Sequence, residues 1–344
     1  MTYAKVAAKD AEKTKRLLRR MRLLDSSMPA EHSPGYVYFP VVDAAKKNKK
    51  LPDAVRIVPG RIGGSKGGVP SYAEQLHSLL SAKEQALLEH GYEQLGTIAI
   101  IGSKLNKRKE RAVANALMQT NRSIKTVLAK AGPISGTYRT RKVRYVAGAR
   151  TYTALYRENN CVFRFDVRKV YFSSKLAYER SRIVSEVRDN EHVIVMFAGV
   201  GPFAIEIAKS HPKARLVAIE INRHGYDSML ENIRLNKAKN VKAVLGDVKR
   251  VYGRYRGWAD RVIMPLPMSS LQFLGEACAV SKRSAVINIY SFGTLGSAFE
   301  DIWRAIKAHA TANNYKVRLL GKREVRQYSS TEVEMEIEHR IMKG

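Results

Sequence analysis

Two glycines and an acidic residue downstream of them carry the clearest chemical signal in the sequence. Gly199 and Gly201 follow a short apolar run, Val193–Met196, and precede a helical pattern that begins near Pro202. Glycines in this position let the backbone turn tightly and approach a ligand closely. Glu220 ends the next apolar run, nineteen residues after Gly201, where a carboxylate can accept hydrogen bonds from two ribose hydroxyls. This spacing predicts a nucleoside-binding turn.

Two further observations narrow the identity of the bound nucleoside. The three-glycine fingerprint of dinucleotide sites is absent, because its third position falls near the bulky Ile205. Gly246 and Asp247 follow a third apolar run, and an acidic side chain there can accept a hydrogen bond from the exocyclic amine of adenine. Taken alone, Asp247 is more typical of a turn residue. Together and in this order, the glycine turn, Glu220 and Asp247 predict S-adenosylmethionine as the cofactor and methyl transfer as the reaction.

The elements that must position these residues lie in residues 167–344, where apolar runs alternate with helical patterns. This alternation predicts a parallel sheet with helices on both faces. The expected strands are Val193–Met196, Arg215–Ile219, Val241–Leu245, Arg261–Met264 and Ala285–Ser291, and the expected helices are Phe203–Lys209 and Gly225–Asn236. Lys316–Leu320 and Val333–Arg340 are expected to close the domain as an antiparallel pair.

The charge balance indicates the partner. Lys and Arg number 61 against 31 Asp and Glu, which gives a formal net charge of +30. A thermophile-type surface would raise both signs together, whereas an excess of one sign favours a polyanion, and nucleic acid is expected. An anionic membrane is the other polyanion. The longest apolar stretch, Val193–Ile205, is shorter than the roughly 20 residues a bilayer requires, so no membrane association is expected.

Two smaller zones, residues 1–88 and 89–166, precede the zone that binds the cofactor. Their expected strands are residues 36–42, 55–58, 95–101, 138–145 and 157–166, with a helix at 108–120 and a solvated or RNA-contacting arm at 1–24. Arg and Tyr alternate along 138–145, a pattern that suits phosphate contact and base stacking, although a solvated sheet face would look the same. The glycine run at 63–68 lacks a Walker ending and is expected to be a flexible connection.

Metal and disulfide chemistry are not expected. Cys161 and Cys278 are the only cysteines, and they have neither metal-site spacing nor a disulfide framework. The eight histidines are scattered. These residues predict no metal site and fit a reducing, cytoplasmic environment.

Four segments match a known family. They read DVRKVYFS at 166–173, LAYER at 176–180, MFAGVGPF at 196–203 and, in the middle zone, SGTYRTR at 135–141. Together they resemble the class I tRNA (guanine-37, N1) methyltransferase family of archaea and eukaryotes, from about Gly91 onward. The resemblance implies an α/β fold: a Rossmann-like S-adenosylmethionine methyltransferase domain at 167–344, a small α+β RNA-binding domain at 89–166 and a tRNA-recognition domain at 1–88. It implies tRNA as the partner, and we expect a monomer.

The resemblance also implies roles for individual residues. Glu179 is the implied general base that removes the proton from guanine N1, since the protonated nitrogen is a poor nucleophile. The negative charge that develops toward O6 calls for a guanidinium, and both Arg139 and Arg141 are candidates. Without the resemblance, Glu179 would be assigned to a helix salt bridge, for instance with Arg182. The candidate cofactor-binding residues are Tyr171, Lys175, Phe197, Ala198, Gly199, Gly201, Phe203, Glu220, Ile221, Asp247, Pro265 and Pro267.

The sequence departs from the family pattern in two places. Pro265 stands where the family usually has an Asn that helps hold the target base, and Pro has neither a side-chain donor nor a backbone N–H. The acid often found before the Met of the glycine motif is replaced by Val195. The Pro265 departure leaves an alternative open: a wyosine-pathway methyl- or aminocarboxypropyl-transferase acting on a tricyclic guanosine derivative in tRNA. A non-catalytic RNA-binding protein is a more distant alternative.

Overall fold

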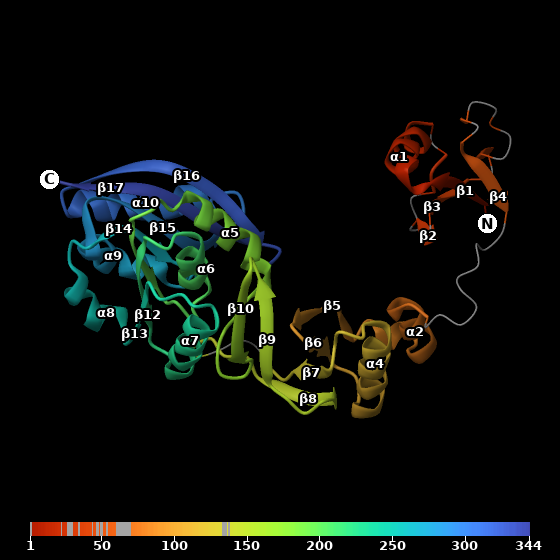
Figure 1. The fold of residues 1–344 in the computed structure, drawn as a ribbon, viewed down its shortest axis with the longest axis horizontal. Helices are drawn as coiled ribbons and strands as arrows, with labels where there is room; N and C mark the ends of the chain where they lie inside the picture. The colour runs from red at the N-terminus through yellow and green to blue at the C-terminus, as the bar shows by residue number, and fades with distance from the viewer. Residues whose placement is uncertain are drawn as a thin grey trace. The chain divides into compact units, whose positions relative to one another are not determined.

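The computed structural model describes residues 2–21, 23–25, 30–33, 35–42, 44–45, 48, 51–52, 54–59, 70–132, 136 and 138–344. Contacts divide the chain into two compact units, residues 1–70 and 71–344, which are described separately (Figure 1). The glycine run at 63–68 lies outside the described residues, as do Ser135 and Thr137 of the matching segment in the middle zone. The domain boundaries expected at 88 and 166 stay predictions.

The described residues of the first unit form a four-stranded antiparallel sheet with one α-helix. The elements are β1 Thr2–Ala7, η1 Ala8–Asp10, α1 Ala11–Arg20, β2 Glu31–Ser33, β3 Tyr36–Val41 and β4 Arg56–Pro59. The strands lie in the order β2-β3-β1-β4, and Leu18 of α1 is buried against Val6 and Phe39. Since β1 is an interior strand and Leu18 and Leu23 are buried in this core, the described part of residues 1–24 belongs to the folded unit, and the expectation of an arm is wrong.

The second unit begins with a smaller four-stranded sheet. Its elements are α2 Tyr72–Leu79, α3 Ala82–Gln85, β5 Leu88–Leu95, β6 Ile98–Ser103, α4 Lys107–Thr120, β7 Thr126–Lys130 and β8 Val143–Gly148. The strands are paired in chain order, β5-β6-β7-β8. The expected single strand at 95–101 is wrong, because the chain reverses at Gly96, whose φ of 60° is in the left-handed region.

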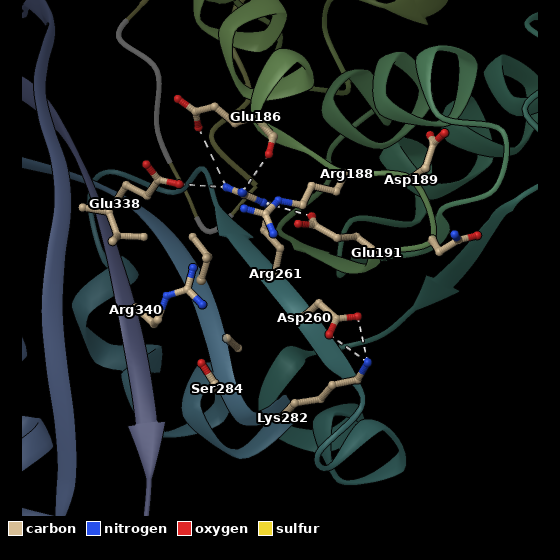
Figure 2. A pocket seen from close by; sticks show the side chains of 14 residues that line it. Glu186, Arg188, Asp189, Glu191, Asp260, Arg261, Lys282, Ser284, Glu338 and Arg340 are labelled. Atoms are coloured by element: carbon tan, nitrogen blue, oxygen red, sulfur yellow. Dashed lines mark hydrogen bonds and ion pairs between the residues drawn. The ribbon is translucent and has the colours of Figure 1, made fainter.

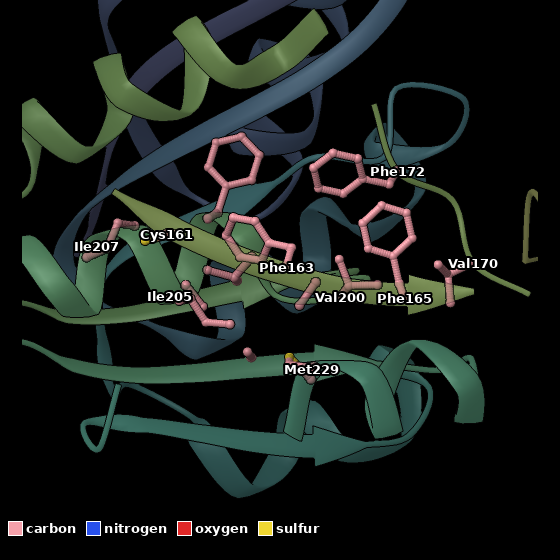
Figure 3. Packing of buried hydrophobic residues seen from close by; sticks show 14 of the residues in the cluster. Cys161, Phe163, Phe165, Val170, Phe172, Val200, Ile205, Ile207 and Met229 are labelled. Carbon is pink, nitrogen blue, oxygen red and sulfur yellow. The ribbon is translucent and has the colours of Figure 1, made fainter. Parts of the chain in front are cut away.

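A two-stranded hairpin, β9 Thr153–Glu158 and β10 Cys161–Asp166, follows. The expected strand at 157–166 is therefore interrupted, because Asn159 and Asn160 adopt φ values of 44° and 60° and form the hairpin turn. Phe163 and Phe165 of β10 pack with Phe172 in the core (Figure 3). This packing places the segment that follows β10 against the larger sheet.

The larger sheet has seven strands in the order β13-β12-β11-β14-β15-β17-β16. Its strands are β11 His192–Met196, β12 Arg215–Glu220, β13 Val241–Leu245, β14 Ala259–Met264, β15 Ser281–Thr294, β16 Tyr315–Gln327 and β17 Glu332–Lys343. Strands β11 to β15 are parallel, and β15-β17-β16 are antiparallel. The order reverses between β11 and β14, which is where open α/β sheets bind ligands, outside the carboxyl ends of the strands.

Helices cover both faces of this sheet, as expected from the alternating pattern. They are η3 Ser174–Leu176, α5 Ala177–Glu186, α6 Pro202–Ser210, α7 Arg223–Leu235, α8 Val248–Val251, η4 Tyr252–Tyr255, η5 Ser270–Phe273, α9 Leu274–Val280 and α10 Ala298–Ala312. Val193 and Val195 of β11 pack toward α5, α6 and α7, whereas Ile194 and Met196 pack toward α8, α9 and α10. Within the described ranges, no helix is long and apolar enough to span a bilayer.

Candidate active site

The glycine turn lies at the carboxyl end of β11, beside the reversal in strand order. Phe197, Gly199 and Gly201 all have left-handed backbones, with φ values of 58°, 59° and 91°. Gly201 caps α6, where a Cβ would lie 2.9 Å from Cγ of Met229. A Cβ on Gly199 would meet only the Tyr171 carbonyl oxygen, at 3.8 Å. The backbone at Gly199 therefore borders open space, as a closely bound cofactor requires.

Glu220 is bound to this turn. Its Oε2 accepts from the Gly199 amide at 2.6 Å, and its Oε1 accepts from the Asn222 amide at 2.7 Å. Burial raises the pKa of Glu220, and these backbone hydrogen bonds oppose the shift. The carboxylate expected to bind ribose is thus held at a fixed orientation next to the glycine turn, and the residues present fit S-adenosylmethionine.

Two further candidates follow the neighbouring strands. Ile221 comes directly after β12 and exposes a large apolar side chain, which suits contact with a flat base. Asp247 follows β13 and caps α8, where its Oδ1 accepts from the Lys249 amide at 2.9 Å. The hydrogen bond from the Lys249 amide uses one of several lone pairs of the Asp247 carboxylate, so the carboxylate can still accept from an adenine amine.

The backbone carbonyls of the proline segment after β14 accept hydrogen bonds from Ser270 and Phe292. Ser270 Oγ donates to the carbonyls of Met264 at 2.9 Å and Leu266 at 2.8 Å. The amide of Phe292 donates to the Pro267 carbonyl at 3.0 Å. Pro265 and Pro267 therefore sit in a fixed turn at the same edge of the sheet as Gly199, with three carbonyls of the turn already accepting.

Glu179 is a buried acid on α5, with 3% of its surface exposed. Arg182 binds it through Nε, at 3.1 Å from Oε2, and through Nη2, at 2.5 Å from Oε1. The Tyr290 hydroxyl donates to Oε1 at 2.8 Å. Burial, followed by the charge of Glu179, raises the pKa of Tyr290, so the hydroxyl remains a donor. The salt bridge considered for Glu179 exists, and the acid also has a buried partner 111 residues away.

The salt bridge continues to β17. Arg182 contacts Glu336 at 3.0 Å, and it also binds Glu186 on its own helix. Burial raises the pKa of Glu336 to about 7, against the opposing effects of Asn288 and Arg182. Neither Tyr290 nor Glu336 was identified from the sequence, because no spacing pattern links β15 and β17 to α5.

The structure separates the two candidate arginines. Arg141 binds Glu93 of β5, and its Nη2 lies 3.4 Å from the Phe172 carbonyl. The guanidinium carbon of Arg139 lies 5.1 Å from the centre of the Tyr171 ring. Nε and Nη1 of Arg139 are buried without a hydrogen-bond partner among the described residues. Arg139 is thus the arginine with donors left for a ligand, whereas Arg141 ties β5 to the segment before η3.

Tyr171 is flanked by a second arginine that the sequence did not indicate. Arg326 of β16 donates to Glu334 at 2.6 Å. Burial acts to lower the pKa of Arg326, but Glu334 and the nearby Tyr171 hydroxyl raise it above its usual value. Tyr171 therefore contacts Arg139 through its ring and Arg326 through its hydroxyl, beside the glycine turn.

Two further candidates, Lys175 and Phe203, differ in exposure. Lys175 lies on η3 with an exposed side chain, one helical turn before Glu179. The Phe203 side chain is buried on α6 and lies 5.9 Å from the Tyr290 ring. Lys175 is open to solvent, whereas Phe203 supports Tyr290, the residue that holds Glu179.

Arg180, next to Glu179 on α5, joins three elements and is 2% exposed. Its Nη2 donates to Glu158 at 2.7 Å and to the Ser173 carbonyl at 3.1 Å, and its Nε lies 3.5 Å from Glu206. Burial raises the pKa of Glu206 to about 8, with Arg180 opposing and Glu158 adding to the rise. This buried cluster fixes the start of α5 against the β9–β10 hairpin.

A cavity of about 580 Å³ lies at the amino ends of the parallel strands, on the side of the sheet away from the glycine turn (Figure 2). Arg261 at its centre is bound to Asn288 at 2.7 Å, Glu338 at 3.1 Å and Glu191 at 3.3 Å. The cavity lies at the amino ends of the parallel strands, whereas ligands of such sheets bind at the carboxyl ends. We therefore do not assign the cofactor to it.

Comparison with known proteins covers nearly the whole chain. Residues 154–318 match the TRM5/TYW2 methyltransferase domain, residues 72–151 the TYW2 N-terminal domain and residues 5–50 the tRNA methyltransferase 5 N-terminal domain. The chain is 33% identical over 346 residues to the tRNA (guanine(37)-N(1))-methyltransferase Trm5b of Pyrococcus abyssi, covering 99% of each chain. The chain belongs to the TRM5/TYW2 methyltransferase family. The resemblance inferred from the sequence motifs is thereby confirmed.

Other members of the TRM5/TYW2 family support the fold and the class of reaction. The chain is 35% identical to the tRNA 4-demethylwyosine(37)-methyltransferase Taw21 of Saccharolobus solfataricus, over 58% of this chain and 76% of the relative. The crystal structure of Pyrococcus abyssi Trm5b matches with a TM-score of 0.74 and 32% identity, over 99% of this chain and 100% of the other. The predicted Rossmann-like α/β fold with smaller N-terminal domains is confirmed.

Two further solved structures of this family contain ligands. A complex of aTrm5 with tRNALeu matches with a TM-score of 0.71 and 26% identity, over 99% of both chains. TYW2 of M. jannaschii in complex with AdoMet matches with a TM-score of 0.60 and 25% identity, over 74% of this chain and 100% of the other.

Proposed function

We propose that this chain transfers a methyl group from S-adenosylmethionine to N1 of guanine 37 in tRNA. The observation that carries the proposal is the pairing of a buried carboxylate, Glu179, held by Tyr290, with an arginine, Arg139, whose Nε and Nη1 have no partner among the described residues. Membership of a family of tRNA methyltransferases gives the substrate class. The contact of Arg139 with Tyr171 and the hydrogen bond of Glu220 to Gly199 support a cofactor site at the carboxyl ends of the parallel strands.

The chemistry requires a base and a charge-stabilising donor. The cofactor supplies an electrophilic methyl group on a sulfonium. As N1 of guanine takes the methyl, the carbon–sulfur bond of the cofactor would break with its electron pair left on sulfur, which gives S-adenosylhomocysteine. The N1 proton passes to Glu179, so the methylated ring stays neutral. Tyr290 and Arg182 orient the Glu179 carboxylate, whose Oε2 accepts only from Arg182 among the described residues and has capacity for another hydrogen bond.

Arg139 is assigned to the guanine O6. Negative charge develops there as N1 loses its proton, and a positioned guanidinium stabilises it more strongly than water can. The unpartnered nitrogens of Arg139 are the support for this assignment, since Arg141 already binds Glu93 and the Phe172 carbonyl. Stacking on Tyr171 keeps the Arg139 guanidinium close to the glycine turn.

The cofactor is assigned to the carboxyl edge of the parallel strands. Glu220 would accept from the ribose hydroxyls, Asp247 from the adenine amine, and Gly199 would allow the close approach that its open side permits. Ile221 and the proline turn at Pro265 and Pro267 would form the walls. The remaining contacts come from Tyr171, Lys175, Phe197, Ala198, Gly201 and the backbone of Phe203.

The partner is tRNA, and the charge supports it. The net charge of +30 supplies the electrostatic attraction that a phosphate backbone requires, and binding should weaken steeply with salt. We assign tRNA recognition to residues 1–88 and RNA contact to the middle zone, residues 89–166. We further propose a monomer that works in the cytoplasm, where the two buried, free cysteines fit a reducing compartment.

The decisive experiment is methyl transfer from labelled S-adenosylmethionine to unmodified tRNA transcripts, followed by nucleoside analysis. N1-methylguanosine is the expected product, and a transcript with adenine at position 37 is the matched control that should remain unlabelled. If guanine transcripts stay unlabelled while tRNA carrying a tricyclic wyosine precursor is modified, the wyosine-pathway alternative replaces this proposal.

A further inference from the structure

The turn between β16 and β17 lies at the same edge of the large sheet as the cofactor site. β17 runs antiparallel to β15, with Phe292 opposite Glu334 and Thr294 opposite Glu332. The beginning of β17 therefore lies beside the carboxyl end of β15, where the parallel strands also end. Tyr328 is in this turn, and its amide donates to the Glu332 carbonyl at 2.9 Å.

Tyr328 presents an aromatic face next to the proline turn. Its ring centre lies 4.3 Å from that of Phe292, at an interplanar angle of 37°. The Phe292 amide in turn donates to the Pro267 carbonyl at 3.0 Å. Half of the Tyr328 surface is exposed. Phe292 supports the ring, the guanidinium carbon of Arg326 lies over it at 6.0 Å from the ring centre, and the exposed half of the residue remains available for a flat ligand.

The aromatic pair lies on the same face of β15 as the proposed base. Side chains two residues apart on a strand share a face, so Phe292 follows Tyr290, which holds Glu179. Arg326, two residues before Tyr328, is fixed by Glu334 and lies near the Tyr171 hydroxyl. Tyr328 therefore lies at the rim of the site. Tyr290 on β15 holds the proposed general base, Glu179, and Arg326 on β16 contacts Tyr171.

The proline turn lacks a side chain that could orient a substrate base. Pro265 offers no side-chain hydrogen bond to a substrate. The carbonyls of Met264, Leu266 and Pro267 already accept from Ser270 and Phe292. A target nucleobase beside the proline turn therefore has to be oriented by contacts other than the Asn side chain that the family usually has at the position of Pro265. Stacking is the contact that an exposed, supported ring provides.

We propose that Tyr328 stacks on the target nucleobase and holds it against the Glu179 carboxylate. This inference rests on the proposed function for the substrate class, and it adds a specificity-determining residue outside the glycine and proline motifs. Stacking requires the ring and not the hydroxyl, so phenylalanine should replace tyrosine, whereas alanine should not.

Kinetics with a tRNA transcript test the proposal. Tyr328→Ala should lower kcat/KM for tRNA roughly tenfold to a hundredfold, and Tyr328→Phe should keep it within about threefold of the unmodified protein. The affinity for S-adenosylmethionine should stay unchanged in both. Leu320→Ala is the matched control, since Leu320 is an exposed apolar residue of β16 that lines the cavity at the amino ends of the parallel strands.

A direct readout of stacking separates this role from a structural one. A transcript with fluorescent 2-aminopurine at position 37 should be quenched on binding to the unmodified protein and to Tyr328→Phe, but not to Tyr328→Ala. Equal quenching and equal kcat/KM for the alanine variant would overturn the proposal. If the unmodified protein acts only on the tricyclic precursor, the proposed function fails, and the same alanine and phenylalanine comparison on that substrate decides the role of Tyr328.

Discussion

The guanidinium carbon of Arg139 lies 5.1 Å from the centre of the Tyr171 ring, and two nitrogens of that guanidinium have no hydrogen-bond partner among the described residues. Arg139 also has a left-handed backbone, with φ of 50°, which is strained for a side chain of this size. A strained residue with buried, unused donors beside a cofactor site is typical of a substrate contact. The first prediction follows from this arrangement.

Replacing Arg139 with Ala should lower kcat about a hundredfold without changing the melting temperature, because removal of one charge-stabilising donor costs on this order. Arg141→Ala is the matched comparison. It breaks the bond to Glu93, so it should lower the melting temperature. Single-turnover methylation and thermal unfolding of both variants measure the difference. A melting-temperature loss in Arg139→Ala equal to that in Arg141→Ala would assign Arg139 to structure.

Replacing Glu179 with Gln should lower kcat by a factor on the order of 10² to 10⁴, because the amide cannot take the proton from N1. Tyr290→Phe removes one orienting hydrogen bond and should cost less. Single-turnover methylation of both variants measures the two losses. A rate for Glu179→Gln within about threefold of the unmodified protein would point to a different base.

A control on the same helix isolates the role of Glu179 from its salt bridge. Glu186 also binds Arg182, so Glu186→Gln removes an ion pair of the same arginine without removing the proposed base. This variant should retain activity within about fivefold. If both glutamine variants lose activity equally, the ion pair of Arg182 is what matters in each.

Replacing Glu220 with Gln should weaken S-adenosylmethionine binding at least roughly tenfold, because a charge-assisted ribose contact is lost. The amide would also place a donor group toward one of the two backbone N–H groups of Gly199 and Asn222. Isothermal titration with the cofactor alone measures the change. Asp227→Asn, which alters an exposed ion pair on α7, is the control and should bind as before.

Stability should fall as pH rises through the range in which Glu206 ionises. Burial raises the pKa of Glu206 to about 8, so its contribution is fully present below the unfolded-state pKa of about 4.5 and is lost by about pH 8. Glu206→Gln keeps an acceptor for Asn159 and removes the ionisation. The unfolding free energy of this variant should therefore fall less between pH 5 and pH 8, by on the order of a few kcal/mol.

Thermal or urea unfolding across this pH range provides the measurement. Glu231→Gln is a suitable control, since Glu231 forms an exposed ion pair with Arg164 and should leave the profile unchanged. Parallel profiles for the unmodified protein and Glu206→Gln would show that the Glu206 carboxyl does not titrate in this range.

Local patterns predicted most of the parallel sheet and the glycine turn. β11, β12 and β14 were recognisable because strands buried on both faces read as short apolar runs. The hairpins at Gly96 and at Asn159-Asn160 were missed, although both sites carry residues that tolerate left-handed backbones. Reading those residues as turns would have corrected both strands.

Contacts between distant segments could not be predicted in this way. Tyr290 binds Glu179 across 111 residues, and Glu336 reaches Arg182 from the last strand. Sequence periodicity indicates which face of a strand is buried, but it does not state which helix covers that face. The distinction between Arg139 and Arg141 has the same origin, because it depends on where Glu93 of β5 lies.

The position of β17 has a consequence for the order in which the protein can fold. β17 is the last described strand along the chain, yet it lies between β15 and β16 in the sheet. Until synthesis reaches residues 332–343, one edge of β15 has no partner and β16 has no place in the sheet. An exposed edge strand invites pairing with other chains. Until β17 is made, the nascent methyltransferase domain therefore exposes an edge of β15 that is open to pairing with other chains.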